Sequence, residues 1–170
     1  MVHILGEGGE KDKSHIELAT CKGRRIPNSR RWVMPLEARR ASIEQWAKLV
    51  PGAELRSLTA TYNCMGMVFA SRRTWVGPDQ LELIKEDDGY EVVDEKKVVP
   101  GDFVLYRNAE REVVHIGLLL EKQPVPSEGQ FLFVVLSKWG QGGEYKHGLR
   151  DVPPILGKPA EFISERKVER

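Results

Sequence analysis

The sequence has few cysteines, no long apolar run and almost no net charge, and each shortage excludes a class of protein. Two cysteines among 170 residues are too few for a disulfide framework, so we expect Cys21 and Cys64 to be free thiols. No apolar stretch approaches the ~20 residues that cross a bilayer, and the first residues lack the apolar core of a secretory signal. These absences predict a cytoplasmic protein without a membrane partner, although export without a signal would leave no mark.

The balance of charge excludes further partners. Lys and Arg total 26 against 25 Asp and Glu, a net charge of +1, so nothing draws the whole chain to a phosphate backbone and we predict no nucleic-acid partner.

The histidines and cysteines show no metal-ligand spacing, which predicts no metal, and nothing indicates another cofactor. The length fits one domain over residues 1–170, with residues 1–31 as a loosely structured N-terminal arm packed on it.

Helical signals come early in the chain. Apolar residues recur at helical spacing from Pro35 to Val50, where Pro51-Gly52 stops the pattern. Asn63 is a suitable N-cap for a second helix that begins at Cys64. A short helix is expected at about residues 79–86.

Strand signals follow the helices. They cover residues 90–93, 103–106, 113–120 and 131–139, with a loop at 121–130 and a short extended piece within 155–163, and a short strand is also expected at 15–19. Helices followed by a run of strands predict an α+β fold, with the N-terminal helices packed on an antiparallel β-meander.

Two residues carry the chemical hypothesis. Cys64 stands in the first turn of a predicted helix, where unpaired N–H groups favour a thiolate. His115 interrupts the apolar strand 113–118, where an imidazole must be hydrogen-bonded or used. Gly117, on the same face as His115, would leave room beside the ring for an approaching helix end. We therefore predict a Cys64 nucleophile with His115 as its base.

A third group usually orients the base, and the sequence leaves three candidates. If Leu120 pairs with Phe131, the residue opposite His115 lies within one position of Leu136, where Ser137 is the polar candidate and Lys138 faces away. The glycine-rich bend at 140–143 could instead bring back Glu144 or His147.

Other residues are expected to support the site. The backbone N–H of Cys64 would hold the oxyanion, helped by the side chain of Asn63 or Tyr62. Trp75 and Trp139 are the aromatic residues best placed to line a substrate groove.

Three short motifs resemble the NlpC-type and CHAP-type branches of the papain-like superfamily. They are Asn63-Cys64, Gly101-Asp102-Phe103-Val104-Leu105-Tyr106 and His115-Ile116-Gly117. The resemblance covers about residues 60–140 and implies a papain-like fold with a helix-borne cysteine, a histidine on the sheet and a third polar residue on the next strand. Asn63 stands where the cell-wall enzymes usually carry Asp, and Met65 where they carry Ser.

A second likeness, over about residues 60–165, is to a group of uncharacterised, mostly bacterial proteins. The shared segments here are Tyr62-Asn63-Cys64, Gly89-Tyr90-Glu91, His115, Ser137-Lys138-Trp139-Gly140 and His147. This likeness implies that Ser137, Lys138 and His147 are neighbours of the site.

Together these patterns predict a cysteine peptidase or amidase that cleaves a peptide, isopeptide or peptidoglycan amide. An acyltransferase with the same dyad, or a papain-like binding module in which Cys64 is merely buried, are the alternatives. The sequence does not specify the substrate or the oligomeric state.

Overall fold

The computed structural model describes residues 3–6, 16–29, 35–125 and 130–166, and every structural statement below concerns these residues. Within them the chain is an α+β protein with three α-helices, a seven-stranded sheet and two small two-stranded sheets. The helices are α1 (Leu36–Leu49), α2 (Cys64–Phe69) and α3 (Leu81–Asp88), with single 3-10 turns η1 (Pro78–Gln80) and η2 (Pro154–Leu156). The strands are β1 (His3–Gly6), β2 (Glu17–Ala19), β3 (Asn28–Ser29), β4 (Glu54–Leu58), β5 (Trp75–Val76), β6 (Glu91–Val93), β7 (Phe103–Arg107), β8 (Val113–Pro124), β9 (Phe131–Lys138), β10 (Gly143–Gly148) and β11 (Lys158–Ser164).

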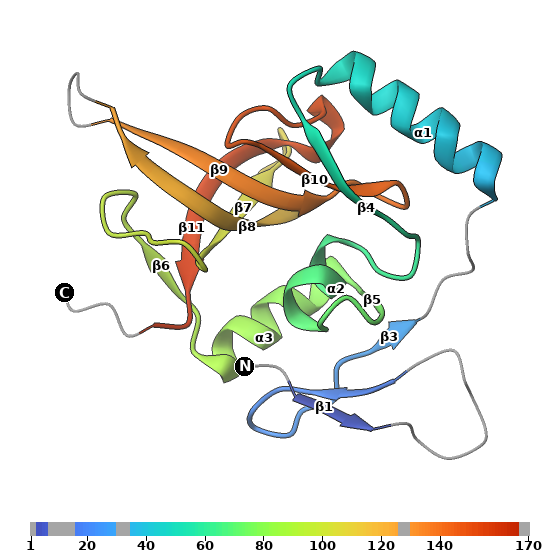
Figure 1. The fold of residues 1–170 in the computed structure, drawn as a ribbon. Coiled ribbons are helices and arrows are strands. Elements are labelled where there is room, and N and C mark those ends of the chain that lie inside the picture. Colours follow the sequence, from blue (N-terminus) through green and yellow to red (C-terminus); the bar gives the residue numbers. More distant parts are fainter. Residues whose placement is uncertain (1–2, 7–15, 30–34, 126–129, 167–170) are drawn as a thin grey trace.

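The large sheet has the strand order β4-β10-β9-β8-β7-β11-β6, and every pairing in it is antiparallel (Figure 1). Strands β7 to β10 follow one another in both sequence and space, as predicted for a meander. At the edges the strand order departs from the order in sequence, because β11 lies between β7 and β6 and β4 pairs with β10. Neither pairing could be predicted from a short segment of sequence, because each joins strands that are distant in the chain. In each case the added strand hydrogen-bonds to backbone groups that would otherwise be open at the edge of the sheet.

The hairpin of β8 and β9 is longer than predicted. Phe131 pairs with Pro124 rather than Leu120, with a register shift between Leu119 and Glu121. The predicted loop at 121–130 is therefore wrong at its first four residues. Lys122 helps to hold this polar extension, since its Nζ donates to three carbonyl oxygens of residues 95–98 and lies 4.0 Å from the centre of a phenyl ring.

Side-chain alternation along β8 divides the interior into two clusters. Ile116 faces α2 and α3, where it belongs to a cluster with Met65 and Ile84. Its neighbour His115 points to the opposite face, where its ring lies 5.3 Å from that of Tyr106. Figure 1 shows α2 and α3 together on one side of the large sheet. Successive residues of a strand point to opposite faces of the sheet. The face that α2 covers therefore decides which polar side chains can lie near Cys64.

The N-terminal segments lie along the α2 side. Strand β1 pairs with β2, and β3 pairs with β5, which joins the early chain to the segment after α2. Leu18 and Ile26 are buried in the cluster that contains Ile116. Within the predicted arm at 1–31, residues 1–2, 7–15 and 30–31 lie outside the described residues.

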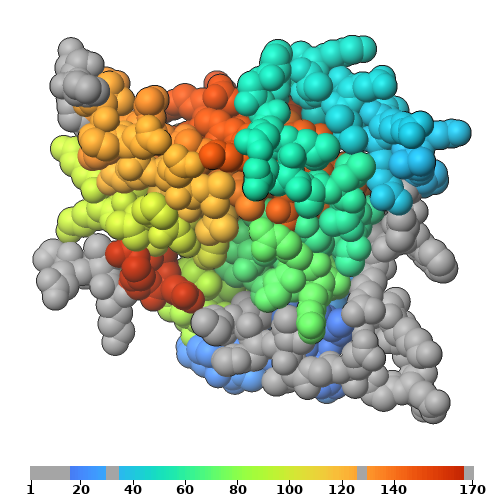
Figure 2. All heavy atoms as spheres, viewed as in Figure 1, coloured from blue at the N-terminus to red at the C-terminus, as the bar shows by residue number. Residues whose placement is uncertain are grey.

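Helix α1 lies at the rim of the molecule, next to β4 (Figures 1 and 2). None of its residues is buried, and Leu36 and Leu49 are 56% and 52% exposed. Its main described anchor is Trp46, whose ring meets that of Trp139 edge-on at 6.0 Å. The helical spacing predicted the helix correctly, but its apolar residues are not buried.

Candidate functional site

Cys64 is the first residue of α2, as predicted. The side chain of Asn63 caps the helix by accepting a hydrogen bond from the Gly66 N–H at 2.9 Å, and it also binds both backbone groups of Val76 on β5. Gly66 has no room for a side chain, because a Cβ would collide with the carbonyl of Thr74. The cap and this close approach fix the thiol at the helix N-terminus.

The surroundings of Cys64 favour a neutral thiol at rest. The residue is partly exposed, and it packs against the cluster that contains Met65 and Ile116. Desolvation raises the pKa of the thiol, while the backbone amides of Ile116, Met65 and Cys64 itself and the charge of Lys138 act in the opposite direction. A thiolate there needs a group that accepts its proton.

Lys138 is completely buried, which is unusual for a lysine. Its Nζ donates to the carbonyl of Gly140 at 3.0 Å and lies 5.5 Å from the centre of the Tyr62 ring. Among the described residues, no carboxylate lies within ion-pair distance of this Nζ. Burial lowers the pKa of Lys138 to about 8, although the charges of Glu144 and Cys64 raise it. The ammonium therefore gives up its proton more readily than an ordinary lysine.

Glu144 lies directly across from Lys138 in the pairing of β10 with β9. Its carboxylate accepts a hydrogen bond from the hydroxyl of Tyr62 and another from Arg72 Nε at 2.6 Å. Burial and this carboxylate raise the pKa of Tyr62 to about 12. We call Cys64, Lys138, Glu144, Tyr62 and Arg72 the thiol–lysine site.

His115 lies on the other face of β8, away from α2. Its side chain is 2% exposed, and its Nε2 has no hydrogen-bond partner among the described residues. Burial, helped by the nearby His147, lowers the pKa of His115 to about 3. We had expected Gly117 to leave room for a helix end beside His115. Instead, the missing side chain makes room for Val135 and Ser137 on this face.

The other predicted partners of the histidine share its face. Ser137 Oγ lies 2.7 Å from His147 Nε2, and it accepts a hydrogen bond from Trp139 Nε1 at 2.9 Å. His147 Nδ1 lies 2.7 Å from the Gly148 carbonyl, which can only accept, so Nδ1 carries the proton and the Ser137 hydroxyl donates to Nε2. The glycine-rich bend thus brings His147 back to Ser137, whereas we had considered His147 as an alternative to Ser137 beside His115. We call His115, Ser137, His147 and Trp139 the histidine pocket.

The structure therefore distributes the predicted site residues over two faces of the sheet. Lys138, whose charge acts on Cys64, lies on the face that α2 covers together with its cross-strand neighbour Glu144, whereas His115 and Ser137 lie with His147 on the opposite face. None of the described contacts of His115 joins it to Cys64. The predicted opposite orientation of Ser137 and Lys138 is present, but the helix that carries the cysteine covers the lysine side.

The supporting residues have other partners than those we predicted. The amide of Asn63 is engaged in the cap and with β5, and the hydroxyl of Tyr62 is engaged with Glu144. Trp75 donates its indole N–H to the carbonyl of Ala60 at 2.9 Å. Trp139 is completely buried against Tyr145, with ring centres 4.1 Å apart. The prediction that Trp139 lines a substrate groove is therefore wrong.

Arg72 is a member of the thiol–lysine site that we did not predict. In the sequence it is marked only by its basic neighbour Arg73. It lies 72 positions from its partner Glu144, and its φ of 63° is in the left-handed region. Such a backbone conformation is uncommon outside glycine and is often found near functional sites. Sequence spacing gives no warning of a contact over this distance.

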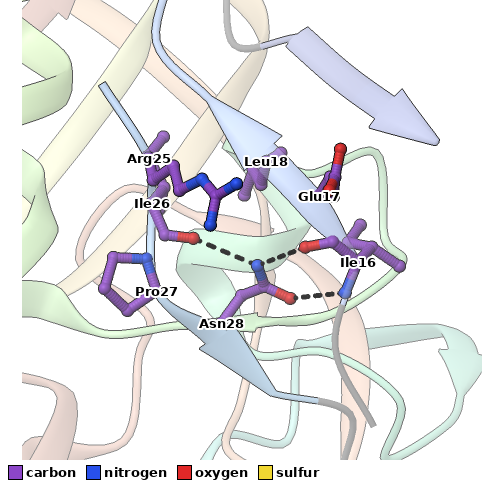
Figure 3. Close-up of a pocket in the computed structure, with 7 residues that line it drawn as sticks. All are labelled: Ile16, Glu17, Leu18, Arg25, Ile26, Pro27 and Asn28. Atoms are coloured by element: carbon purple, nitrogen blue, oxygen red, sulfur yellow. Dashed lines mark hydrogen bonds between the residues drawn. The ribbon is translucent and has the colours of Figure 1, made fainter. Parts of the chain in front are cut away.

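A cavity of about 400 Å³ lies between β2 and the segment before β3 (Figure 3). Asn28 closes it: its amide Nδ2 donates to the carbonyls of Ile16 and Ile26, and its Oδ1 accepts from the Ile16 N–H. The lining carries one acid and one base, Glu17 and Arg25. The partly buried amide of Asn28 therefore spends its hydrogen bonds on the chain itself.

The described residues define an α+β protein with a cysteine at a capped helix N-terminus and a buried lysine whose charge acts on it. No family model, curated protein or solved structure matches this chain. Over the described ranges, no cluster of three His, Cys, Asp or Glu residues could hold a metal ion. None of the helices in those ranges is long and apolar enough to span a membrane.

Proposed function

We propose that the protein is a cysteine hydrolase of amide bonds, in which Cys64 is the nucleophile and Lys138 accepts its proton. The observation that carries this proposal is a completely buried lysine, on the sheet face that α2 covers, whose charge acts on a cysteine at the N-terminus of that helix. The pKa of about 8 at Lys138 supports it, since a fraction of the amine is neutral near pH 7. The proposal includes a papain-like fold, which the resemblance of three short motifs to NlpC-type enzymes implies.

The chemistry proceeds in two steps. The neutral amine of Lys138 takes the proton of the Cys64 thiol, the sulfur bonds to the substrate carbonyl carbon, and the resulting ammonium returns the proton to the leaving amine as the C–N bond breaks. A water molecule then attacks the thioester, its proton passing to Lys138, and the carboxylic acid leaves as the Cys64 thiol is restored. The backbone N–H groups around Cys64 would stabilise the oxyanion in both steps.

Glu144 acts as a positioning residue in this proposal. Its negative charge raises the pKa of Lys138, which keeps the amine a stronger base than burial alone would allow. Arg72 and Tyr62 hold the carboxylate across the β9–β10 pairing. The network therefore balances the basicity of Lys138 against its burial.

The substrate class stays open between peptide, isopeptide and peptidoglycan amides. An acyltransferase would share the first step and differ only in the acceptor that attacks the thioester. Product analysis with and without an added amine separates the two, because only a transferase forms the new amide in preference to the acid.

The test measures acylation of Cys64 in a Cys21→Ser background, since Cys21 is also a free and exposed thiol. We expect p-nitrophenyl acetate to add one acetyl group to the protein, seen by intact mass, and Cys64→Ala to abolish it. Lys138→Met should slow the reaction at least about tenfold, by analogy with other general bases. The matched control is Lys146→Met, on the neighbouring strand, where the amine pairs with Glu121 at the surface.

Two results would count against the proposal. If Cys64 acylates or alkylates no faster than a simple thiol, the protein is better described as a binding module with a buried cysteine. If His115→Phe slows acylation and Lys138→Met does not, the base is the histidine that we first predicted.

A further inference from the structure

A second surface feature lies outside the thiol–lysine site and carries a separate inference. It is a groove of about 1010 Å³ between the β7–β8 turn, the segment around η2 and the start of β11. Gly157 fixes one wall, because its φ of 80° is in the left-handed region and a Cβ there would collide with the carbonyl of Arg107. Arg111, with a φ of 65°, turns the opposite rim. We call this feature the basic groove.

The rim of the basic groove is positively charged. Its charged lining residues are Arg107, Arg111, Arg150 and Lys158, and no acid lines it. Arg107 is paired with Glu161 at 2.5 Å and donates to the carbonyl of Arg111. For the other three cations, all exposed, the described residues provide no ion pair. Exposed cations without partners are free to pair with a ligand of opposite charge.

The rest of the lining of the basic groove is largely apolar. Ile155 is 76% exposed, the highest value among the exposed large hydrophobic residues. Val152, Pro154, Pro159 and Ala160 complete this strip. A ligand that covers Ile155 gains the free energy of removing its side chain from water, which adds to the attraction of the rim.

We propose that the basic groove docks an extended acidic peptide segment of a partner protein. Carboxylates of the segment pair with Arg111, Arg150 and Lys158, and its apolar residues cover Ile155 and the adjoining strip. Nucleic acid fits less well, because stacking of unpaired bases uses aromatic side chains and the lining has none. This docking is independent of the chemistry at Cys64.

The test uses a fluorescein-labelled peptide that alternates glutamate with leucine, and fluorescence anisotropy as the readout. We expect saturable binding that weakens as salt is added, and at least roughly tenfold weaker binding by Arg150→Glu and Lys158→Glu. Ile155→Ser should weaken binding with little change in its salt dependence. The matched control is Arg40→Glu on α1, an exposed arginine far from the lining in sequence, which should bind as the unaltered protein does.

Three outcomes would overturn the inference. They are an absence of saturable binding, an equal loss in the Arg40→Glu control, and tighter binding of labelled polyuridine than of the peptide with the same sensitivity to the groove variants. Because every altered side chain is exposed, thermal melts of the variants should match that of the unaltered protein, which separates lost binding from lost folding.

Discussion

Replacing Lys138 with methionine should stabilise the fold and, at the same time, lower the reactivity of Cys64. The pKa of Lys138 falls from its ordinary value of 10.5 to about 8 because the side chain is buried. The folded protein therefore binds this proton less tightly than the unfolded chain. A fall of about 2.5, at about 1.4 kcal/mol for each pH unit, means that the charge costs the fold about 3 kcal/mol at pH 7.

The net gain in the variant should be smaller than this cost. Methionine fills a similar volume without a charge, but the hydrogen bond to the Gly140 carbonyl is lost, which costs about 1 kcal/mol. We expect the free energy of unfolding to rise by about 1–2 kcal/mol at pH 7, following these two contributions. The cost of the charge is full below pH 8 and disappears as the pH rises toward 10.5. The advantage of the variant should therefore shrink over that interval.

Urea unfolding at pH 7 and pH 10 measures this difference, and iodoacetamide labelling in the Cys21→Ser background measures the reactivity of Cys64. Lys146→Met again serves as the control, because its amine lies at the surface beside Glu121. A Lys138→Met protein that unfolds more easily at pH 7 and still labels at the original rate would refute the reasoning. Both the burial argument and the role of Lys138 as proton acceptor would then fail.

Three further predictions concern the same two faces of the sheet. Cys64→Ala should abolish acylation and lower the free energy of unfolding by about 1 kcal/mol, as urea curves can check, because the side chain packs against the cluster that contains Met65 and Ile116. Glu144→Gln should move the pH midpoint of Cys64 alkylation downward, since the carboxylate raises the pKa of Lys138; an unchanged midpoint would contradict its positioning role. His115 has a folded pKa of about 3, below its ordinary 6.5, so its contribution to stability is present above pH 6.5 and lost as the pH falls toward 3. His115→Phe should therefore flatten the loss of stability between pH 7 and pH 5, up to about 1.4 kcal/mol per pH unit, and leave alkylation of Cys64 unchanged.

Local patterns were sufficient for several features. The Asn63 cap, the start of α2 at Cys64 and the strands around residues 103–107 and 131–138 all follow from short-range preferences that the fold preserves. The bend at residues 140–143 was also predictable, because glycines allow a tight hairpin there, although the contact of His147 with Ser137 was not. Each of these features depends on residues that are close in sequence, within one helical turn or one β-hairpin.

Long-range pairings had no comparable signal. The contact of Arg72 with Glu144 spans 72 positions, and the insertion of β11 beside β7 joins the end of the chain to its middle. The register of β8 with β9 was misjudged because the polar residues after Leu119 resemble a loop, although their backbone continues the ladder. Pairing partners are chosen by the whole sheet, so a single segment carries little information about them.

The sequence by itself determined an α+β chain with two free thiols, one of them at the N-terminus of a capped helix, and with Ser137 and Lys138 on opposite faces of a strand. Only the tertiary structure decided which of those faces the helix covers. Alternation fixes the relation between neighbouring side chains, whereas the choice of covered face comes from packing of Met65, Ile84 and Ile116 across distant elements. That packing buries a lysine rather than a histidine on the face of the sheet that Cys64 covers, and a lysine in the sequence usually indicates an exposed position.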